Sequence, residues 1–112
     1  MTHPVTQDLI RAVVDVVVRT ARPERVVLFG SWARGDAGAG SDIDLLVIEA
    51  APFTRGRSRR QEAARVSRAL AGFLVPIDLL LFSADEIDRW RDTPNHVVAR
   101  AAREGKIVYE RA

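Results

Sequence analysis

Two aspartates stand two positions apart at the start of an apolar run, in the order Asp42-Ile43-Asp44. Side chains two apart on a β-strand point to the same face, so a strand here brings both carboxylates together while Ile43 faces the core. Two adjacent carboxylates repel each other unless a cation neutralises them. Their hard oxygen ligands suit Mg²⁺, which proteins usually bind with one or two carboxylates together with substrate phosphates.

A third aspartate, Asp78, interrupts another apolar run that extends from Ile77 to Phe82. A lone charge inside such a strand needs a partner. If this strand lies beside the one that carries Asp42 and Asp44, the three carboxylates meet. Three carboxylates can hold two metal ions about 3.5–4 Å apart, the arrangement used for in-line phosphoryl and nucleotidyl displacement.

Gly30 and Ser31 follow a short apolar run, Val26 to Phe29. A glycine directly after a strand allows the backbone to approach a ligand closely. If Ser31 begins a short helix, its hydroxyl and the first backbone N–H groups face an anion at the helix N-terminus. Arg34, one turn further on, adds a guanidinium for a bidentate phosphate contact. The sequence therefore predicts a phosphate-binding loop next to the metal site.

Each of these motifs alone is a weak indicator. Acidic pairs are common on surface strands, a Gly-Ser after a strand is most often a turn, and a strand aspartate is more often paired with arginine than with a metal. Their order is more specific: strand, Gly-Ser, glycine-rich loop, Asp-x-Asp, apolar strand, and then a strand with an interior aspartate. This context favours the phosphate and metal interpretation.

Apolar spacing and the positions of proline and glycine predict the elements that must position these side chains. We expect helices at residues 6–21, 31–34, 58–73, 83–91 and 93–104, and strands at residues 26–29, 42–49, 77–82 and 106–110. The valines of residues 6–21 leave a strand as the competing interpretation there. Thr93 is the expected N-cap of the last helix, with Pro94 as its first residue. The order, roughly α-β-β-α-β-α-α-β, predicts an α/β (α+β) domain with a small mixed β-sheet flanked by helices.

Composition and charge limit the classes of protein. The 112 residues, 47% of them hydrophobic, predict a single domain over residues 1–112 with one core. The sequence contains no cysteine, no signal peptide and no apolar stretch of about 18 residues, so we expect a cytoplasmic protein that does not span a membrane. All basic residues except Lys106 are arginine, but a net charge of +2 does not indicate nucleic-acid binding.

The sequence resembles the minimal nucleotidyltransferase (MNT) family, in the superfamily that includes DNA polymerase beta. The family signature is Gly-Ser-x-Ala-Arg-Gly, a short loop and Ser-Asp-x-Asp-Leu, and it occurs without departure at residues 30–35 and 41–45. The family's third carboxylate lies in a segment like residues 77–79, and the ending at residues 104–109 is also similar. The resemblance covers nearly the whole chain from residue 26 on.

The resemblance implies a nucleotidyltransferase fold and an active enzyme. It implies that Asp42 and Asp44 bind two Mg²⁺ ions and that Asp78 completes the catalytic metal site and helps to activate the attacking hydroxyl. It also implies that Gly30 and Ser31 hold the triphosphate of ATP, the nucleotide donor. Family members of this size are often antitoxins of HEPN-domain toxins that cleave RNA, and some transfer AMP from ATP to a tyrosine of that toxin. We therefore expect this reaction and this partner.

Two other functions stay open. The first is a binding module that masks its partner without catalysis, although no metal-binding aspartate has been replaced. The second is a nucleotidyltransferase for a small molecule such as an aminoglycoside, for which a homo-oligomer would have to build the acceptor pocket. The short chain leaves few residues for holding an acceptor, which favours a second protein in that role.

The remaining charged and aromatic residues support plainer interpretations. Six arginines between Arg55 and Arg68 form a basic run, which we interpret as a solvated face, with an acidic partner, RNA or the nucleotide as alternatives. His3 and His96 show no ligand spacing, and we expect both at the surface. Trp32 lies inside the Gly-Ser motif, and we expect it to pack on the fold rather than to stack on a base.

Overall fold

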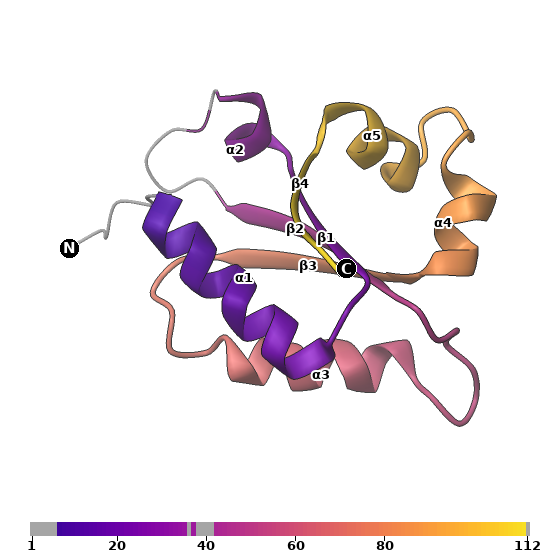
Figure 1. Ribbon diagram of the computed structural model, residues 1–112, viewed down its shortest axis with the longest axis horizontal. Coiled ribbons are helices and arrows are strands. Elements are labelled where there is room, and N and C mark those ends of the chain that lie inside the picture. Colours follow the sequence, from indigo (N-terminus) through magenta and orange to yellow (C-terminus); the bar gives the residue numbers. More distant parts are fainter. Residues whose placement is uncertain (1–6, 36, 38–41, 112) are drawn as a thin grey trace.

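A four-stranded sheet forms the centre of the molecule in the computed structural model, which describes residues 7–35, 37 and 42–111 (Figure 1). The strands are β1 (Arg25–Phe29), β2 (Ile43–Glu49), β3 (Ile77–Ser83) and β4 (Lys106–Glu110). Their order across the sheet is β3-β2-β1-β4. β1 runs antiparallel to β2 and to β4, whereas β2 and β3 are parallel. The expected mixed sheet is confirmed, with β3 and β4 at its two edges.

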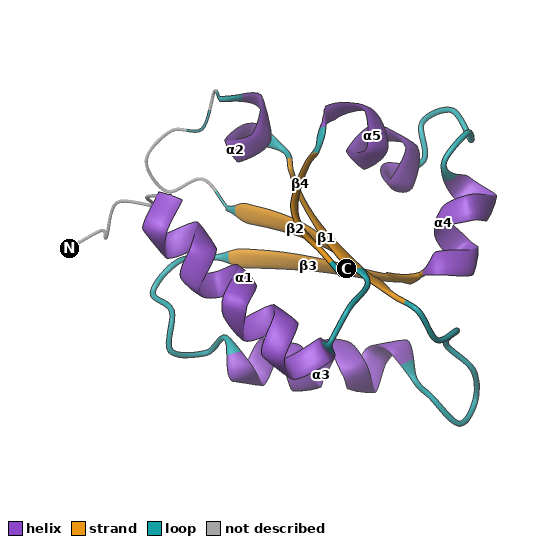
Figure 2. Cartoon of the chain, viewed as in Figure 1, coloured by secondary structure: helices purple, strands orange, loops and turns teal. Residues whose placement is uncertain are grey.

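Helices cover both faces of this sheet (Figure 2). They are α1 (Gln7–Ala21), α2 (Ser31–Arg34), α3 (Arg59–Ala69), α4 (Ala84–Trp90) and α5 (Val97–Glu104). α1 and α3 pack against each other on one face, and α4 and α5 lie on the other. α3 supplies the crossover that the parallel pairing of β2 and β3 requires. None of the helices in the described residues is long and apolar enough to cross a bilayer.

The chain forms the helix α1, and not the competing strand, because the apolar side chains of this segment share one helical face. Ile10, Val13, Val14 and Val17 are all buried on that face. Packing of an amphipathic face contributes more to helix stability than intrinsic propensity does, so burial here outweighs the preference of valine for strands.

Side chains of β2 alternate between two apolar layers. Ile43, Leu45 and Val47 are buried in the layer that also contains the apolar face of α1. Leu46 belongs to the second layer, together with residues of α4 and α5. β2 is therefore buried on both faces of the sheet. Because Asp44 has the same alternation as Leu46, its carboxylate projects toward the face that carries α4 and α5.

The prediction that Thr93 and Pro94 begin the last helix is wrong. α5 begins after them, with His96 as its N-cap, whose ring Nδ1 accepts a hydrogen bond from the backbone N–H of Val98 at 3.1 Å. Asn95, directly before this cap, has a φ of 65°. A residue in this left-handed region cannot continue a right-handed helix, so the Thr93 turn is separated from α5.

His96 is half-buried, and the expectation that it lies at the surface is corrected accordingly. Its ring stacks on Trp90 with centroids 4.8 Å apart and forms a T-shaped contact with Phe82, with centroids 6.2 Å apart. These contacts join α4, α5 and the end of β3. His3 lies outside the described residues.

Two further helix boundaries test the sequence predictions. α3 ends at Ala69 rather than at Phe73, because the chain turns there and the Phe73 N–H donates to the carbonyl of Leu70 at 3.1 Å. α4 follows Ser83, within the helix expected at residues 83–91, and begins with a capping box: the Ser83 hydroxyl accepts from the Glu86 N–H, and the Glu86 carboxylate accepts from the Ser83 N–H.

Candidate active site

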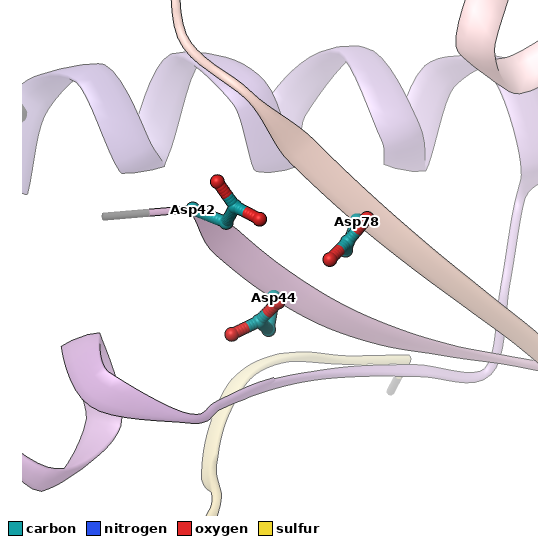
Figure 3. Close-up of side chains that lie close together, drawn as sticks. All are labelled: Asp42, Asp44 and Asp78. Carbon is teal, nitrogen blue, oxygen red and sulfur yellow. The ribbon is translucent and has the colours of Figure 1, made fainter. Parts of the chain in front are cut away.

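The three predicted metal-binding aspartates lie together at one end of the sheet (Figure 3). Asp44 and Asp78 are the second residues of β2 and β3 and are paired in register, and Asp42 directly precedes β2. Each offers a carboxylate oxygen, and these oxygens all lie within 4.8 Å of one another. Parallel pairing of β2 and β3 thus produces the cluster that the sequence analysis expected from neighbouring strands.

The cluster favours a cation. Burial raises the pKa of the Asp44 carboxyl, the negative charges of Asp78 and Asp42 raise it further, and Arg34 opposes this shift. A raised pKa means that the surroundings disfavour the charged carboxylate, so a positive ion nearby stabilises this charged form. Three hard oxygen donors within this distance fit one or two divalent ions such as Mg²⁺, so the residues agree with the expected metal.

Gly30 is required by the position of Asp44. It directly follows Phe29, the register partner of Asp44 on β1. Its φ of 72° and ψ of −154° are available to glycine and to almost no other residue. A Cβ built at this position would stand 2.3 Å from Oδ2 of Asp44. The glycine therefore brings the backbone of the Gly-Ser loop against the carboxylate cluster.

Ser31 begins the short helix α2, as predicted. The N–H groups of Ala33 and Arg34 both donate to the Gly30 carbonyl at 3.1 Å, and Gly35 ends the helix with its N–H on the Ser31 carbonyl at 3.0 Å. This turn fixes the Gly-Ser loop beside the aspartates.

A cavity of about 340 Å³ adjoins Asp44 on the side of β1 and α2. Gly30, Ser31 and Arg34 line it, so the three residues predicted to bind phosphate share one space with Asp44, a predicted metal ligand. The Arg34 guanidinium lies 3.8 Å from the Glu104 carboxylate, in a half-exposed ion pair. The bidentate phosphate contact predicted for Arg34 stays a prediction.

The opposite wall of this cavity comes from α5, which the sequence analysis did not connect to the site. Val97, Arg100 and Glu104 line the cavity. Their spacing, which can be read from the sequence alone, places them on one helical face. What the sequence does not indicate is that this face meets the Gly-Ser loop, since that depends on how α5 packs on the sheet.

The basic run between Arg55 and Arg68 is only partly a solvated face. Three of its members form ion pairs with carboxylates: Arg57 with Glu49, Arg59 with Glu86 and Arg65 with Glu62. The others, Arg55, Arg60 and Arg68, are exposed. Half of the run therefore stabilises the loop after β2 and the start of α3. Trp32 packs against the core, as expected.

The chain belongs to the nucleotidyltransferase domain family, whose sequence pattern matches residues 10–108. This confirms the expected family and fold. No match was found among curated proteins.

Solved structures share the fold at low sequence identity. A protein from Sulfolobus solfataricus described as a candidate nucleotidyltransferase is 24% identical, with a TM-score of 0.62 over 93% of this chain and 79% of that one. A toxin-antitoxin structure with AMP-PNP is 22% identical, with a TM-score of 0.55 over 89% and 73%. A toxin-antitoxin MntA-HpeT variant with two aspartates changed to glutamate is 19% identical, with a TM-score of 0.54 over 96% and 75%.

Proposed function

We propose that this protein is a Mg²⁺-dependent adenylyltransferase that modifies a hydroxyl of a partner toxin and thereby acts as its antitoxin. One observation carries the proposal. The carboxylate oxygens of Asp42, Asp44 and Asp78 lie within 4.8 Å of one another, beside a cavity lined by Gly30 and Ser31. A metal site next to a phosphate-binding loop is the arrangement that transfer of a nucleotide requires.

Each group has a role that follows from its place. Asp42 and Asp44 would hold two Mg²⁺ ions, and Asp78 would complete the site of the catalytic ion. Bound Mg²⁺ supplies charge neutralisation of the triphosphate and lowers the pKa of an oxygen that it coordinates. The Ser31 hydroxyl and the backbone at Gly30 hold the phosphates in the cavity.

The reaction transfers AMP in line. The acceptor hydroxyl oxygen attacks the α-phosphorus of ATP, a new P–O bond forms, the bond from the α-phosphorus to the bridging oxygen breaks, and pyrophosphate leaves. Asp78 accepts the hydroxyl proton. This carboxylate is exposed on β3, an edge strand, whereas the cavity lies on the opposite side of Asp44. The acceptor therefore approaches from the β3 edge.

A protein acceptor fits this exposure. Asp42 and Asp78 are both exposed, so a side chain of a second protein can reach them. Two of the structures that share the fold are described as toxin-antitoxin structures, one of them with AMP-PNP. The resemblance to MNT antitoxins adds a HEPN-domain toxin as the partner and a tyrosine as the acceptor. We also expect a cytoplasmic protein, because ATP is available there.

The test uses ATP labelled at the α-phosphate, Mg²⁺ and a lysate of the source organism. We expect label in one protein band with the wild type and none with Asp44→Asn. Asp88→Asn, which removes an exposed carboxylate on α4, is the matched control and retains transfer. ATP labelled at the γ-phosphate must give no label in protein, since that phosphate leaves with pyrophosphate.

Three results would redirect the proposal. Transfer by Asp44→Asn at the wild-type rate contradicts it. Stoichiometric neutralisation of the toxin by Asp44→Asn without ATP indicates a binding module that masks its partner. Label in a small molecule but not in protein indicates the small-molecule nucleotidyltransferase.

A further inference from the structure

We propose that Arg100 of α5 binds the phosphate chain of the nucleotide, as the main cation of the cavity. The inference rests on the proposed function, because it names a binding residue for the same nucleotide. The cavity places Arg100 opposite Gly30 and Ser31, with Asp44 beside them. A nucleotide whose phosphates lie between the Gly-Ser loop and the metal site therefore lies next to this guanidinium.

The charges around the cavity distinguish Arg100 from Arg34. Arg34 lies 3.8 Å from the Glu104 carboxylate, so part of its charge is already compensated. The guanidinium of Arg100 forms neither a hydrogen bond nor an ion pair within the described part of the chain, and it is exposed to the cavity. An arginine presents five N–H donors in a planar arrangement that matches phosphate oxygens. Arg100 is thus the side chain with its donors available for an anion.

The backbone that carries Arg100 is held firmly against the sheet. Val98, Ala99 and Ala101, its neighbours on α5, are buried. At the helix end, a Cβ on Gly105 would stand 2.4 Å from Cγ1 of Val27, so the chain passes β1 in close contact. Binding groups on a packed helix lose little conformational freedom when the ligand arrives, which favours affinity.

The next arginine of α5, Arg103, provides a matched control. It is exposed and does not line the cavity. Replacing either arginine by alanine removes one positive charge from the same helix. A difference between the two variants therefore reports the position of the guanidinium and not the net charge of the protein.

The experiment measures binding and does not depend on transfer. A fluorescent ATP analogue is titrated in Mg²⁺ against wild type, Arg100→Ala, Arg100→Lys and Arg103→Ala, and inorganic tripolyphosphate is used as the competitor. We expect Arg100→Ala to raise the Kd about tenfold or more, the loss typical of a hydrogen bond to a charged group. Arg100→Lys restores part of the affinity, and Arg103→Ala binds as the wild type does. Tripolyphosphate competes more weakly in Arg100→Ala.

The outcomes separate this inference from the proposed function. If the wild type binds no nucleotide, both fail. If the wild type binds but Arg100→Ala binds equally well, only the role of Arg100 is wrong. A loss of analogue binding without weaker tripolyphosphate competition also overturns it, because Arg100 then contacts another part of the nucleotide. A cooperative thermal transition of both alanine variants near the wild-type melting temperature shows that both are folded.

Discussion

Asp44 and Asp78 are register partners on the parallel strands β2 and β3, so their side chains leave the sheet on the same face at the same level. Their separation along the chain is bridged by α3. The parallel pairing thus holds two like charges together permanently, with Asp42 as a third. Without a cation, the folded protein bears the repulsion among these carboxylates, and a bound cation relieves it.

Replacing Asp44 with asparagine removes a charge from the cluster. We expect Asp44→Asn to unfold in Mg²⁺-free buffer at the wild-type temperature or above it, since the amide does not repel Asp78. Added Mg²⁺ should stabilise the wild type by about 1.4 kcal/mol at ten times its Kd and leave the variant unchanged. Thermal denaturation with and without Mg²⁺ measures both effects. An equal Mg²⁺ response of the two proteins would show that the ion does not bind at Asp44.

Gly30 and Gly35 offer a comparison within one loop. Both have positive φ, 72° and 82°, but a Cβ on Gly30 meets Asp44 at 2.3 Å, whereas one on Gly35 meets nothing within 4 Å. Gly35→Ala should therefore lose about 1–2 kcal/mol from backbone strain alone. Gly30→Ala should lose more and should also lose Mg²⁺-ATP binding.

Urea denaturation and nucleotide titration of the two alanine variants measure these losses. Equal stability of Gly30→Ala and Gly35→Ala, with nucleotide binding intact in both, would mean that the contact between Gly30 and Asp44 does not limit the site.

Much of the site was predictable because its residues are close in sequence or lie on regular strands. Gly30, Ser31, Asp42 and Asp44 fall within one loop and its flanking strands. Their relative places follow from the period of a strand and the start of a helix. The place of Asp78 in the cluster was predictable only on the condition that its strand lies beside β2, and the structure meets this condition.

The rest of the site depends on packing that no local pattern contains. Arg100 faces the cavity only because α5 returns across the sheet to meet the end of β1. The predicted start of α5 was wrong. Pro94 suits a first helical turn, but Asn95 has a left-handed conformation and His96 caps the helix, so that α5 begins later. A histidine cap is not among the preferred residues for that position, so the sequence gives little signal for it.

The pairing of Glu49 was also not visible from the sequence. Its side chain is 4% exposed at the end of β2, with Nη2 of Arg57 2.6 Å from Oε1. Burial, together with a hydrogen bond to Glu62 and the charge of Glu62, raises the pKa of Glu49 to about 7, and Arg57 opposes this shift. Burial would raise the pKa of Glu62 as well, but hydrogen bonds with Glu49 and Arg65 lower it. The two carboxyls share a proton at moderate pH.

This pair makes the stability depend on pH. Between the ordinary pKa of 4.5 and about 7, the folded protein keeps a proton on Glu49 that the unfolded chain releases. The free energy of unfolding therefore falls as the pH rises through this window, by at most about 3 kcal/mol. The lowered pKa of Glu62 acts oppositely, and its contribution is lost on acidification below 4.5.

Glu49→Gln should remove the loss of stability between pH 5 and about 7, because the amide stays neutral and can still donate to Glu62. Glu110→Gln, which changes an exposed carboxylate paired with Arg25, should retain it. Urea denaturation at several pH values measures the slope. An equal dependence of the free energy of unfolding on pH in the wild type and in Glu49→Gln would show that another group takes up the proton.

Arg59 and Arg60 are adjacent arginines with different environments, so their substitutions should differ in effect. The Arg59 guanidinium pairs with Glu86, donates to the Leu81 carbonyl at 3.3 Å and lies over the Phe82 ring, 5.3 Å from its centroid. Arg60 is exposed and makes none of these contacts. Arg59 therefore joins the start of α3 to β3 and α4, and Arg60 does not.

We expect Arg59→Ala to lower the free energy of unfolding by about 1–2 kcal/mol, a range that allows for solvent screening of the half-exposed ion pair. Arg60→Ala should change it by less than about 0.5 kcal/mol, as surface substitutions usually do. Urea denaturation of both variants measures the difference. Since α3 is the crossover between β2 and β3, loosening it should also weaken Mg²⁺ binding by Asp44 and Asp78. Equal stability of the two variants would mean that Arg59 belongs to the solvated face first expected for the whole basic run.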